Sequence, residues 1–202
     1  SENILRIFIA DDHRIVIEGL TVYLHSKPGL LVCGSARNAA EALTAIQNLP
    51  PDAVIADISL ENSSGLDLIK DIHFHLPQLP VIVLSMHDEL IYAERAMRAG
   101  AKGYIMKDQS FECVVDAIHA VTRKETYFSE AVKTRILNRL FSPSSESGSI
   151  VDLLTDRELE VFRLIGQGFR PRHIAEKLNM SIHTVETHCK RIRVKLNLED
   201  MK

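Results

Sequence analysis

The first 122 residues alternate short apolar runs with amphipathic segments, and this alternation restricts the possible folds more than any other feature. The apolar runs are residues 5–9, 30–33, 53–56, 81–84 and 103–106. Each run has the length of a strand and is mostly apolar on both faces, as in a parallel sheet covered on both sides. Helical periodicity fills residues 15–24, 39–49, 66–76, 90–99 and 111–121. Five strand–helix repeats predict a doubly wound α/β domain with a five-stranded parallel sheet of order 2-1-3-4-5.

A polar segment divides the chain into two parts. Residues 142–149 contain five Ser, one Pro and one Gly, a composition that cannot bury a core and is typical of a flexible tether. Residues 126–141 before it have a helical pattern. We therefore expect an α/β domain over residues 1–122, a linker of helix and tether over 123–150, and a small all-helical domain over 151–202.

The pattern after the tether is helical throughout. Thr155 and Glu158 form the signature of a capping box, and Ser181 stands where it would cap a later helix. That later helix has one apolar stripe, made of Val185, Cys189, Ile192 and Leu196. Its opposite face carries Thr184, Thr187, His188, Lys190, Arg191 and Lys195. Two helices joined by a short turn predict a helix-turn-helix, although a basic face can also be an ordinary solvated surface.

Charge is unequally shared between the two parts of the chain. The formal net charge is −3, but residues 1–130 hold 18 acidic and 11 basic side chains (−7), and residues 131–202 hold 9 and 13 (+4). This asymmetry indicates a cation or protein partner for the first part and a polyanion for the second. The alternative is an ordinary variation in charge between two domains. No apolar run reaches a membrane span, no export signal is present, and the three cysteines lie far apart. We expect a cytoplasmic protein that does not contact membranes.

Acidic residues follow two strands that the predicted order makes neighbours. Asp11 and Asp12 follow the first apolar run, and Asp57 follows the third. Ligands of such sheets bind at the carboxyl ends of these strands, where three carboxylates favour Mg²⁺. Ser85 ends the fourth predicted strand and Lys107 ends the fifth, so a hydroxyl and an ammonium group complete a site for a phosphoryl group. Taken singly, the Asp11–Asp12 pair could be a helix N-terminal charge cluster, and His13 is expected only to cap the helix that follows.

These residues, together with Gly100–Asp108, resemble the receiver domain of bacterial response regulators, which has a flavodoxin-like fold. The resemblance implies that a histidine kinase phosphorylates Asp57. It further implies that Mg²⁺ is bound by Asp12, Asp57 and the backbone carbonyl of Ser59, and by Asp11 through water. Ser85 and Lys107 would contact the phosphoryl group, and Tyr104 would change rotamer as the switch residue.

The segments Leu154–Glu158, Ile174–Leu178 and Ser181–His188 resemble the LuxR-type DNA-binding domain, and the two resemblances together indicate the NarL/FixJ subfamily. The second resemblance implies that bases are contacted by Glu186, Thr187 and Lys190, and the DNA backbone by Thr184, His188 and Arg191. Relatives have a fourth helix after Leu196, so the end of the chain at Lys202 predicts that this helix is missing. We expect a regulator of promoter DNA that forms a homodimer when phosphorylated.

Two other classes of protein remain possible at this stage. A phosphohydrolase with an aspartate nucleophile has a similar site, but it carries a D-x-D motif on the first strand, which is absent here. A signalling protein whose helical domain binds another protein would share the same layout. We favour a regulator that is not an enzyme, beyond promoting its own phosphorylation and dephosphorylation.

Overall fold

The computed structural model describes residues 4–141 and 150–198 of the chain. It divides into two compact units, residues 1–137 and residues 138–202, and each is described here by itself. The predicted Ser-rich tether, residues 142–149, lies outside the described residues. So do residues 199–202, where a fourth C-terminal helix would begin.

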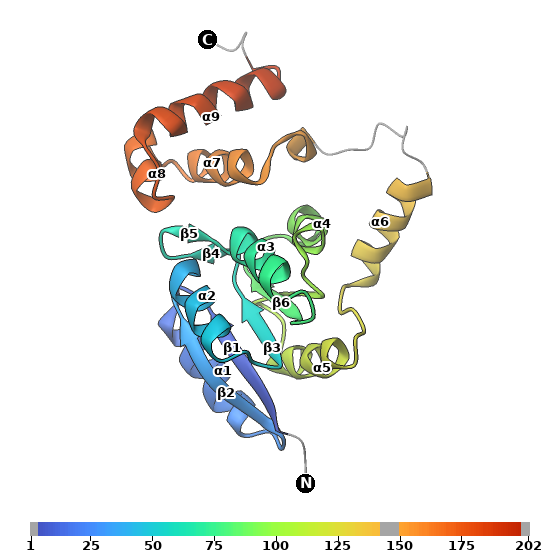
Figure 1. Cartoon of the computed structure of the whole chain (residues 1–202). Coiled ribbons are helices and arrows are strands. Elements are labelled where there is room, and N and C mark those ends of the chain that lie inside the picture. Colours follow the sequence, from blue (N-terminus) through green and yellow to red (C-terminus); the bar gives the residue numbers. More distant parts are fainter. Residues whose placement is uncertain (1–3, 142–149, 199–202) are drawn as a thin grey trace. The chain divides into compact units, whose positions relative to one another are not determined.

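The N-terminal unit contains the predicted parallel sheet (Figure 1). Its strands are β1 (Leu5–Ala10), β2 (Leu30–Ala36), β3 (Ala53–Ala56), β6 (Val81–Ser85) and β7 (Gly103–Met106). They pair in the order β2-β1-β3-β6-β7, and every pair is parallel. In sequence order this is 2-1-3-4-5, so the predicted fold class is confirmed.

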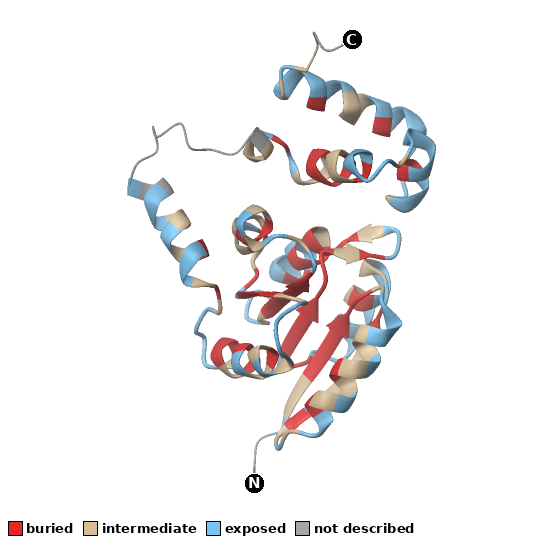
Figure 2. Cartoon of the chain, turned by 180° about the vertical axis from the view of Figure 1, so that it is seen from behind, coloured by how far each residue is buried: buried red, intermediate tan, exposed pale blue. Residues whose placement is uncertain are grey.

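Helices cover both faces of the sheet, which explains why the strands are apolar on both sides. The helices are α1 (Arg14–His25), α2 (Ala39–Asn48), α3 (Gly65–His75), α4 (Glu89–Ala99) and α5 (Phe111–Thr122). Helices α1 and α5 pack on one face through a cluster that includes Leu20, Leu24, Val114 and Ile118. Every residue of β3 and β6 is buried, and the sheet is the most buried part of the unit (Figure 2).

A two-stranded hairpin between β3 and α3 was not predicted. It consists of β4 (Ser59–Leu60) and β5 (Ser63–Ser64), with Asn62 in the left-handed region at φ 53°. Strands of two residues are too short to leave a periodic pattern in the sequence. The hairpin follows Asp57 directly, so it shapes the loop at the carboxyl end of β3.

The segment after α5 packs against the edge of the sheet. Tyr127 N–H donates to Lys102 O and the N–H of Tyr104 donates to Tyr127 O, both at 2.8 Å, so Tyr127 extends the sheet beside Gly103. Helix α6 therefore begins at Glu130 and ends at Phe141, although the sequence predicted a helix from residue 126. The expected helix starts late because the backbone of residue 127 is extended and paired with β7.

The C-terminal unit is helical, as predicted. A 3₁₀ turn (Ile150–Leu153) precedes α7 (Asp156–Gly166), α8 (Pro171–Lys177) and α9 (Ile182–Lys195). The predicted capping box is present, with Glu158 N–H donating to Thr155 Oγ1 at 3.3 Å and Thr155 N–H donating to Glu158 Oε2 at 2.9 Å. Ser181 caps α9 by accepting the N–H of Thr184 at 3.0 Å. No helix in the described part of the chain is long and apolar enough to span a bilayer.

Candidate functional site

Four strand ends bring charged and polar side chains to one edge of the sheet. Ser85 Oγ donates to Asp57 Oδ1 at 2.7 Å, and Lys107 Nζ donates to Asp57 Oδ2 at 2.7 Å. Lys107 Nζ also lies 2.6 Å from Asp11 Oδ2. The structure thus joins Asp11, Asp57, Ser85 and Lys107 by direct contacts, as expected from the strand order at this edge.

Burial makes the electrostatics of these contacts strong. Asp11 and Asp57 are buried, and the side chain of Lys107 is 8% exposed. Burial raises the pKa of the Asp11 carboxyl and the charge of Asp57 adds to this rise, although the hydrogen bond from Lys107 opposes it. Burial alone would lower the pKa of Lys107, but Asp57 and Asp11 raise it overall. The site therefore holds two buried carboxylates that share one ammonium group.

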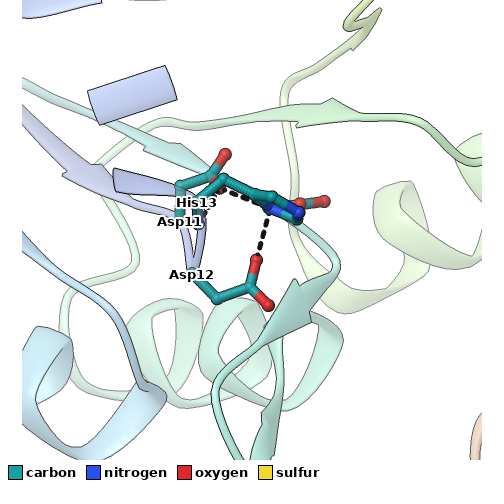
Figure 3. A group of neighbouring side chains, drawn as sticks. Asp11, Asp12 and His13 are labelled. Carbon is teal, nitrogen blue, oxygen red and sulfur yellow. Dashed lines mark hydrogen bonds and ion pairs between the residues drawn. The ribbon is translucent and has the colours of Figure 1, made fainter. Parts of the chain in front are cut away.

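Asp12 and His13 lie beside Asp11 (Figure 3). His13 Nδ1 is 2.7 Å from Asp12 Oδ1 and 3.3 Å from Asp11 Oδ1. Asp12 Oδ1 is buried, and its contact with His13 does not have hydrogen-bond geometry. Ligand atoms of Asp11, Asp12, His13 and Asp57 all lie within 4.8 Å of one another. A buried carboxylate oxygen without a donor, among further carboxylates, is a donor set that fits a hard divalent cation.

The hairpin after Asp57 is held close to it by Gly65. Gly65 N–H donates to the carbonyl oxygen of Ile58 at 2.7 Å, and a Cβ at Gly65 would lie 1.8 Å from the carbonyl oxygen of Asp57. Only glycine fits this approach. Ser59 lies in the hairpin, and its hydroxyl is 2.9 Å from His87 Nε2. The loop that carries Ser59 is thereby tied to the loop after Ser85.

Tyr104 is buried and points to the same loop. Its hydroxyl donates to the backbone carbonyl of His87 at 2.7 Å. Burial raises the pKa of Tyr104, and the charge of Asp57 adds to the rise, so the hydroxyl stays protonated as a donor. The sequence did not single out His87 or the contacts of His13, because each depends on a ring orientation that spacing does not reveal.

The predicted DNA-contacting residues lie on α9 of the C-terminal unit. The exposed ones are Thr184, Glu186, Lys190 and Arg191, whereas Thr187 and His188 are half-buried. Lys195 was expected on the same face, but its Nζ donates to Glu158 Oε2 at 2.6 Å and so ties α9 to α7. Lys195 thus serves the packing of the unit, and the basic character of the exposed face comes from its other cations.

Comparison with known proteins assigns a family to both units. Residues 7–119 match the model of the response regulator receiver domain, and residues 152–201 match that of the bacterial regulatory proteins of the luxR family. Oxygen regulatory protein NreC of Staphylococcus epidermidis is 34% identical in an alignment of 201 positions that covers 96% of this chain and 92% of that protein. The uncharacterized transcriptional regulatory protein YxjL of Bacillus subtilis is 32% identical over 97% of this chain and 91% of its own length.

Solved structures give the same result. RcsB from Salmonella enterica serovar Typhimurium, bound to a promoter in the presence of phosphomimetic BeF₃⁻, is 28% identical with a TM-score of 0.67, covering 98% of this chain and 95% of that one. A structure of two RcsB dimers bound to two parallel DNAs is also 28% identical, with a TM-score of 0.61 over 98% and 94% of the two chains. The chain therefore belongs to the DNA-binding response regulators of two-component systems, in the NarL/FixJ subfamily that joins a receiver domain to a LuxR-type helix-turn-helix.

Proposed function

We propose that Asp57 accepts a phosphoryl group from a sensor histidine kinase and that this phosphorylation controls DNA binding by the C-terminal unit. The observation that carries the proposal is the direct contact of Ser85 and Lys107 with the two oxygens of Asp57. In the transfer, a carboxylate oxygen of Asp57 attacks phosphorus while the bond from phosphorus to the kinase imidazole nitrogen breaks. In the proposed step, Lys107 and Ser85 donate to the phosphoryl oxygens and so stabilise the charge on them.

Mg²⁺ is the cofactor that we propose for this step. When bound, it would neutralise charge on the phosphoryl oxygens and on the acids. Asp12, Asp57 and the backbone carbonyl of Ser59 are the proposed direct ligands, and Asp11 the ligand through water. The support is the donor set itself, in particular the buried Asp12 Oδ1 that accepts no hydrogen bond.

We propose that the phosphorylated state reaches the rest of the chain through Tyr104. Phosphorylation would draw Ser85 toward the phosphoryl group and shift the loop whose His87 carbonyl accepts the Tyr104 hydroxyl. The backbone of Tyr104 is paired with Tyr127, and Ser129 Oγ donates to Glu89 Oε1 of α4 at 2.9 Å. The segment before α6 is thus bonded both to the switch residue and to α4, which supports a mechanical link to the linker.

A label-transfer experiment tests the role of Asp57. The full chain is incubated with radiolabelled acetyl phosphate, with and without Mg²⁺, and incorporation is counted. We expect one phosphoryl group per chain with Mg²⁺ and none in Asp57→Asn, with Asp52→Asn as a matched control because Asp52 lies at the opposite end of β3. Turnover of acetyl phosphate without accumulation of labelled protein would instead favour the phosphohydrolase alternative, and labelling of Asp57→Asn would contradict the proposal.

We propose further that α9 binds promoter DNA, with Glu186, Thr187 and Lys190 at the bases and with Thr184, His188 and Arg191 at the backbone. Support comes from the exposed cations of α9 and from the RcsB complexes with promoter DNA. We also propose that phosphorylation favours a homodimer, as in the RcsB dimers on DNA, because two half-sites need two copies. Because promoter DNA is the proposed target, we propose that the protein acts in the cytoplasm.

Salt dependence of DNA binding tests this assignment. Affinity should fall steeply with salt, and Arg191→Ala should reduce the slope of log K against log salt by about 1, because one phosphate contact is lost. Lys70→Ala on α3 is the control, since it removes an exposed cation from the other unit. A flat salt dependence would contradict DNA binding and favour a protein partner for the helical unit.

A further inference from the structure

We propose that His13 is an additional ligand of the metal site, through its Nδ1, and that it selects for transition-metal divalent ions such as Mn²⁺. This inference rests on the metal site of the proposed function and goes beyond it, because neither the receiver resemblance nor the Mg²⁺ proposal gives His13 a role at the ion. With Mg²⁺ the site would use oxygen ligands alone, and with Mn²⁺ it would add one imidazole nitrogen.

The first argument is the spacing of the donor atoms. Adjacent ligands on an octahedral ion with bonds of about 2.1 Å lie about 3 Å apart. His13 Nδ1 lies 2.7 Å from Asp12 Oδ1 and 3.3 Å from Asp11 Oδ1, on either side of this value. Figure 3 shows the imidazole turned toward the Asp12 carboxylate. The ring nitrogen and the Asp12 carboxylate are therefore already spaced as neighbouring ligands of one ion, and Asp11 Oδ1 lies close enough to act through a water on that ion.

The second argument is what His13 does not do. His13 is the N-cap residue of α1, where a side chain commonly accepts a helix N–H, and the sequence suggested such a cap. The structure confirms His13 as the N-cap residue, but its side chain makes no capping hydrogen bond. Only its backbone serves the helix, with its carbonyl accepting the N–H of Val16 at 3.0 Å. The imidazole is thus turned away from the helix and toward the acids.

The third argument is the anchoring of His13. Its N–H donates to Asp11 Oδ1 at 2.8 Å, which fixes the backbone beside the site, while the side chain is 59% exposed. Lys107 contacts the other oxygen of Asp11, Oδ2, so the ammonium group does not lie between His13 and Oδ1. Because the backbone of His13 is fixed while its imidazole ring is largely exposed, Nδ1 can move by a few tenths of an ångström to fit an ion.

Ligand chemistry then sets the metal preference. Mg²⁺ is a hard ion that takes oxygen ligands and keeps several waters, so an imidazole adds little to its binding. Imidazole is a ligand of first-row transition ions, and affinity for a nitrogen donor is lowest for Mn²⁺ and rises toward Cu²⁺. Mn²⁺ also takes carboxylate oxygens, so it can use both kinds of donor in this site and gives the most demanding test of the imidazole. We expect His13→Ala to lower Mn²⁺ affinity about ten-fold and to change Mg²⁺ affinity less than about three-fold, because loss of even an outer-shell partner of a metal ligand costs roughly 10–100-fold in affinity.

Pulsed electron paramagnetic resonance of the Mn²⁺-loaded full chain tests the proposal, because it detects a ¹⁴N nucleus bonded to Mn²⁺ independently of phosphorylation. The expected result is nitrogen modulation in the wild type, its loss in His13→Ala and His13→Gln, and its retention in His87→Ala, which removes the other imidazole near the site. Calorimetric titration of the same four proteins with MnCl₂ and MgCl₂ gives the affinities.

The outcomes separate this inference from the function on which it rests. Mn²⁺ binding without nitrogen modulation in the wild type would overturn the role of His13 and leave the carboxylate site intact. Retained modulation in both His13 variants would overturn it as well. Absence of Mn²⁺ and Mg²⁺ binding in the wild type would overturn the metal site itself, and with it both proposals.

Discussion

Replacement of Lys107 by Met gives the most direct test of the electrostatics around Asp57. Lys107 Nζ lies 2.6 Å from Asp11 Oδ2 and 2.7 Å from Asp57 Oδ2, and both acids are buried. Met has a similar length and no charge, so packing is largely kept. In metal-free buffer the substitution leaves two buried carboxylates without their shared ammonium group, and the N-terminal unit should lose stability.

The size of this loss has an upper limit set by protonation. One of the two acids can take up a proton, and forcing a carboxyl with an ordinary pKa near 3.9 to stay protonated at pH 7 costs about 4 kcal/mol, at 1.36 kcal/mol per pKa unit. Breaking a buried ion pair costs about 3–5 kcal/mol. Because the pKa of Asp11 is already raised in the wild type, part of this cost is already present there. We therefore expect a loss of about 2–4 kcal/mol at pH 7.

The loss should shrink as the pH falls. In the variant, the folded-state pKa of one acid lies above its unfolded value, so the folded state binds a proton that the unfolded state lacks. Stability of the variant relative to the wild type then rises by up to about 1.4 kcal/mol for each pH unit below pH 7, until the pH reaches the unfolded pKa and the unfolded state binds the proton as well. Two pH units lower, at pH 5, the difference between the two proteins should be at most about 1 kcal/mol.

Urea unfolding followed by tyrosine fluorescence measures this effect in the full chain. All four tyrosines, at positions 23, 92, 104 and 127, lie in the N-terminal unit, and the chain has no Trp. Unfolding is compared in chelator at pH 7 and pH 5, and then with Mg²⁺, which should restore much of the loss because it binds only the folded acids. A variant as stable as the wild type in chelator at pH 7, or equally destabilised at both pH values, would refute the reasoning.

Three further predictions concern single contacts. Gly65→Ala should destabilise the N-terminal unit by about 1–3 kcal/mol and slow labelling of Asp57 from acetyl phosphate, because the new Cβ would lie 1.8 Å from the Asp57 carbonyl oxygen. Lys195→Met should lower the stability of the C-terminal unit by about 1–2 kcal/mol at pH 7, measured by circular dichroism. The substitution leaves the Glu158 carboxylate buried without its cation, but the cost is limited because Lys195 is a third exposed and solvent screens the pair. Burial alone would raise the pKa of Glu158, but the hydrogen bonds from Lys195 and from the Thr155 cap lower it overall. The ion pair in the wild type therefore stabilises the unit above the pKa that Glu158 has in the unfolded state, and this contribution is lost as the pH falls through the pKa of the folded state. An equal acid sensitivity in Lys195→Met would contradict this. Ser181→Ala should lower the thermal midpoint of the same unit, at a cost of about 1 kcal/mol for the lost cap.

The contacts that the sequence predicted correctly depend on strand ends or on residues close together in the chain. A parallel sheet aligns the carboxyl ends of its strands, so Asp57 and Lys107 had to meet once the strand order was known, and they lie 2.7 Å apart. The capping box at Thr155 was equally readable, because its partners are three residues apart in the chain. Local rules and regular topology carry such predictions without knowledge of side-chain packing.

Other features depended on contacts between distant residues or on the choice of a rotamer. Lys195 looked like one more cation of the α9 face, but it pairs with Glu158, 37 residues away, because α7 and α9 pack together. His13 looked like a helix cap, yet its ring turns to the acids instead. Tyr127 carries no strand pattern and still extends the sheet, since an open edge at β7 offers unpaired backbone groups.

By itself, then, the sequence determined the sheet, its order and the acidic edge, because buried strands and their ends leave a periodic record in the chain. Only the tertiary structure decided which cation neutralises which acid, where the segment after α5 becomes helical, and that the His13 ring faces Asp11 and Asp12. These are outcomes of competition for hydrogen bonds among groups far apart in sequence, and such competition is settled only when the chain is folded.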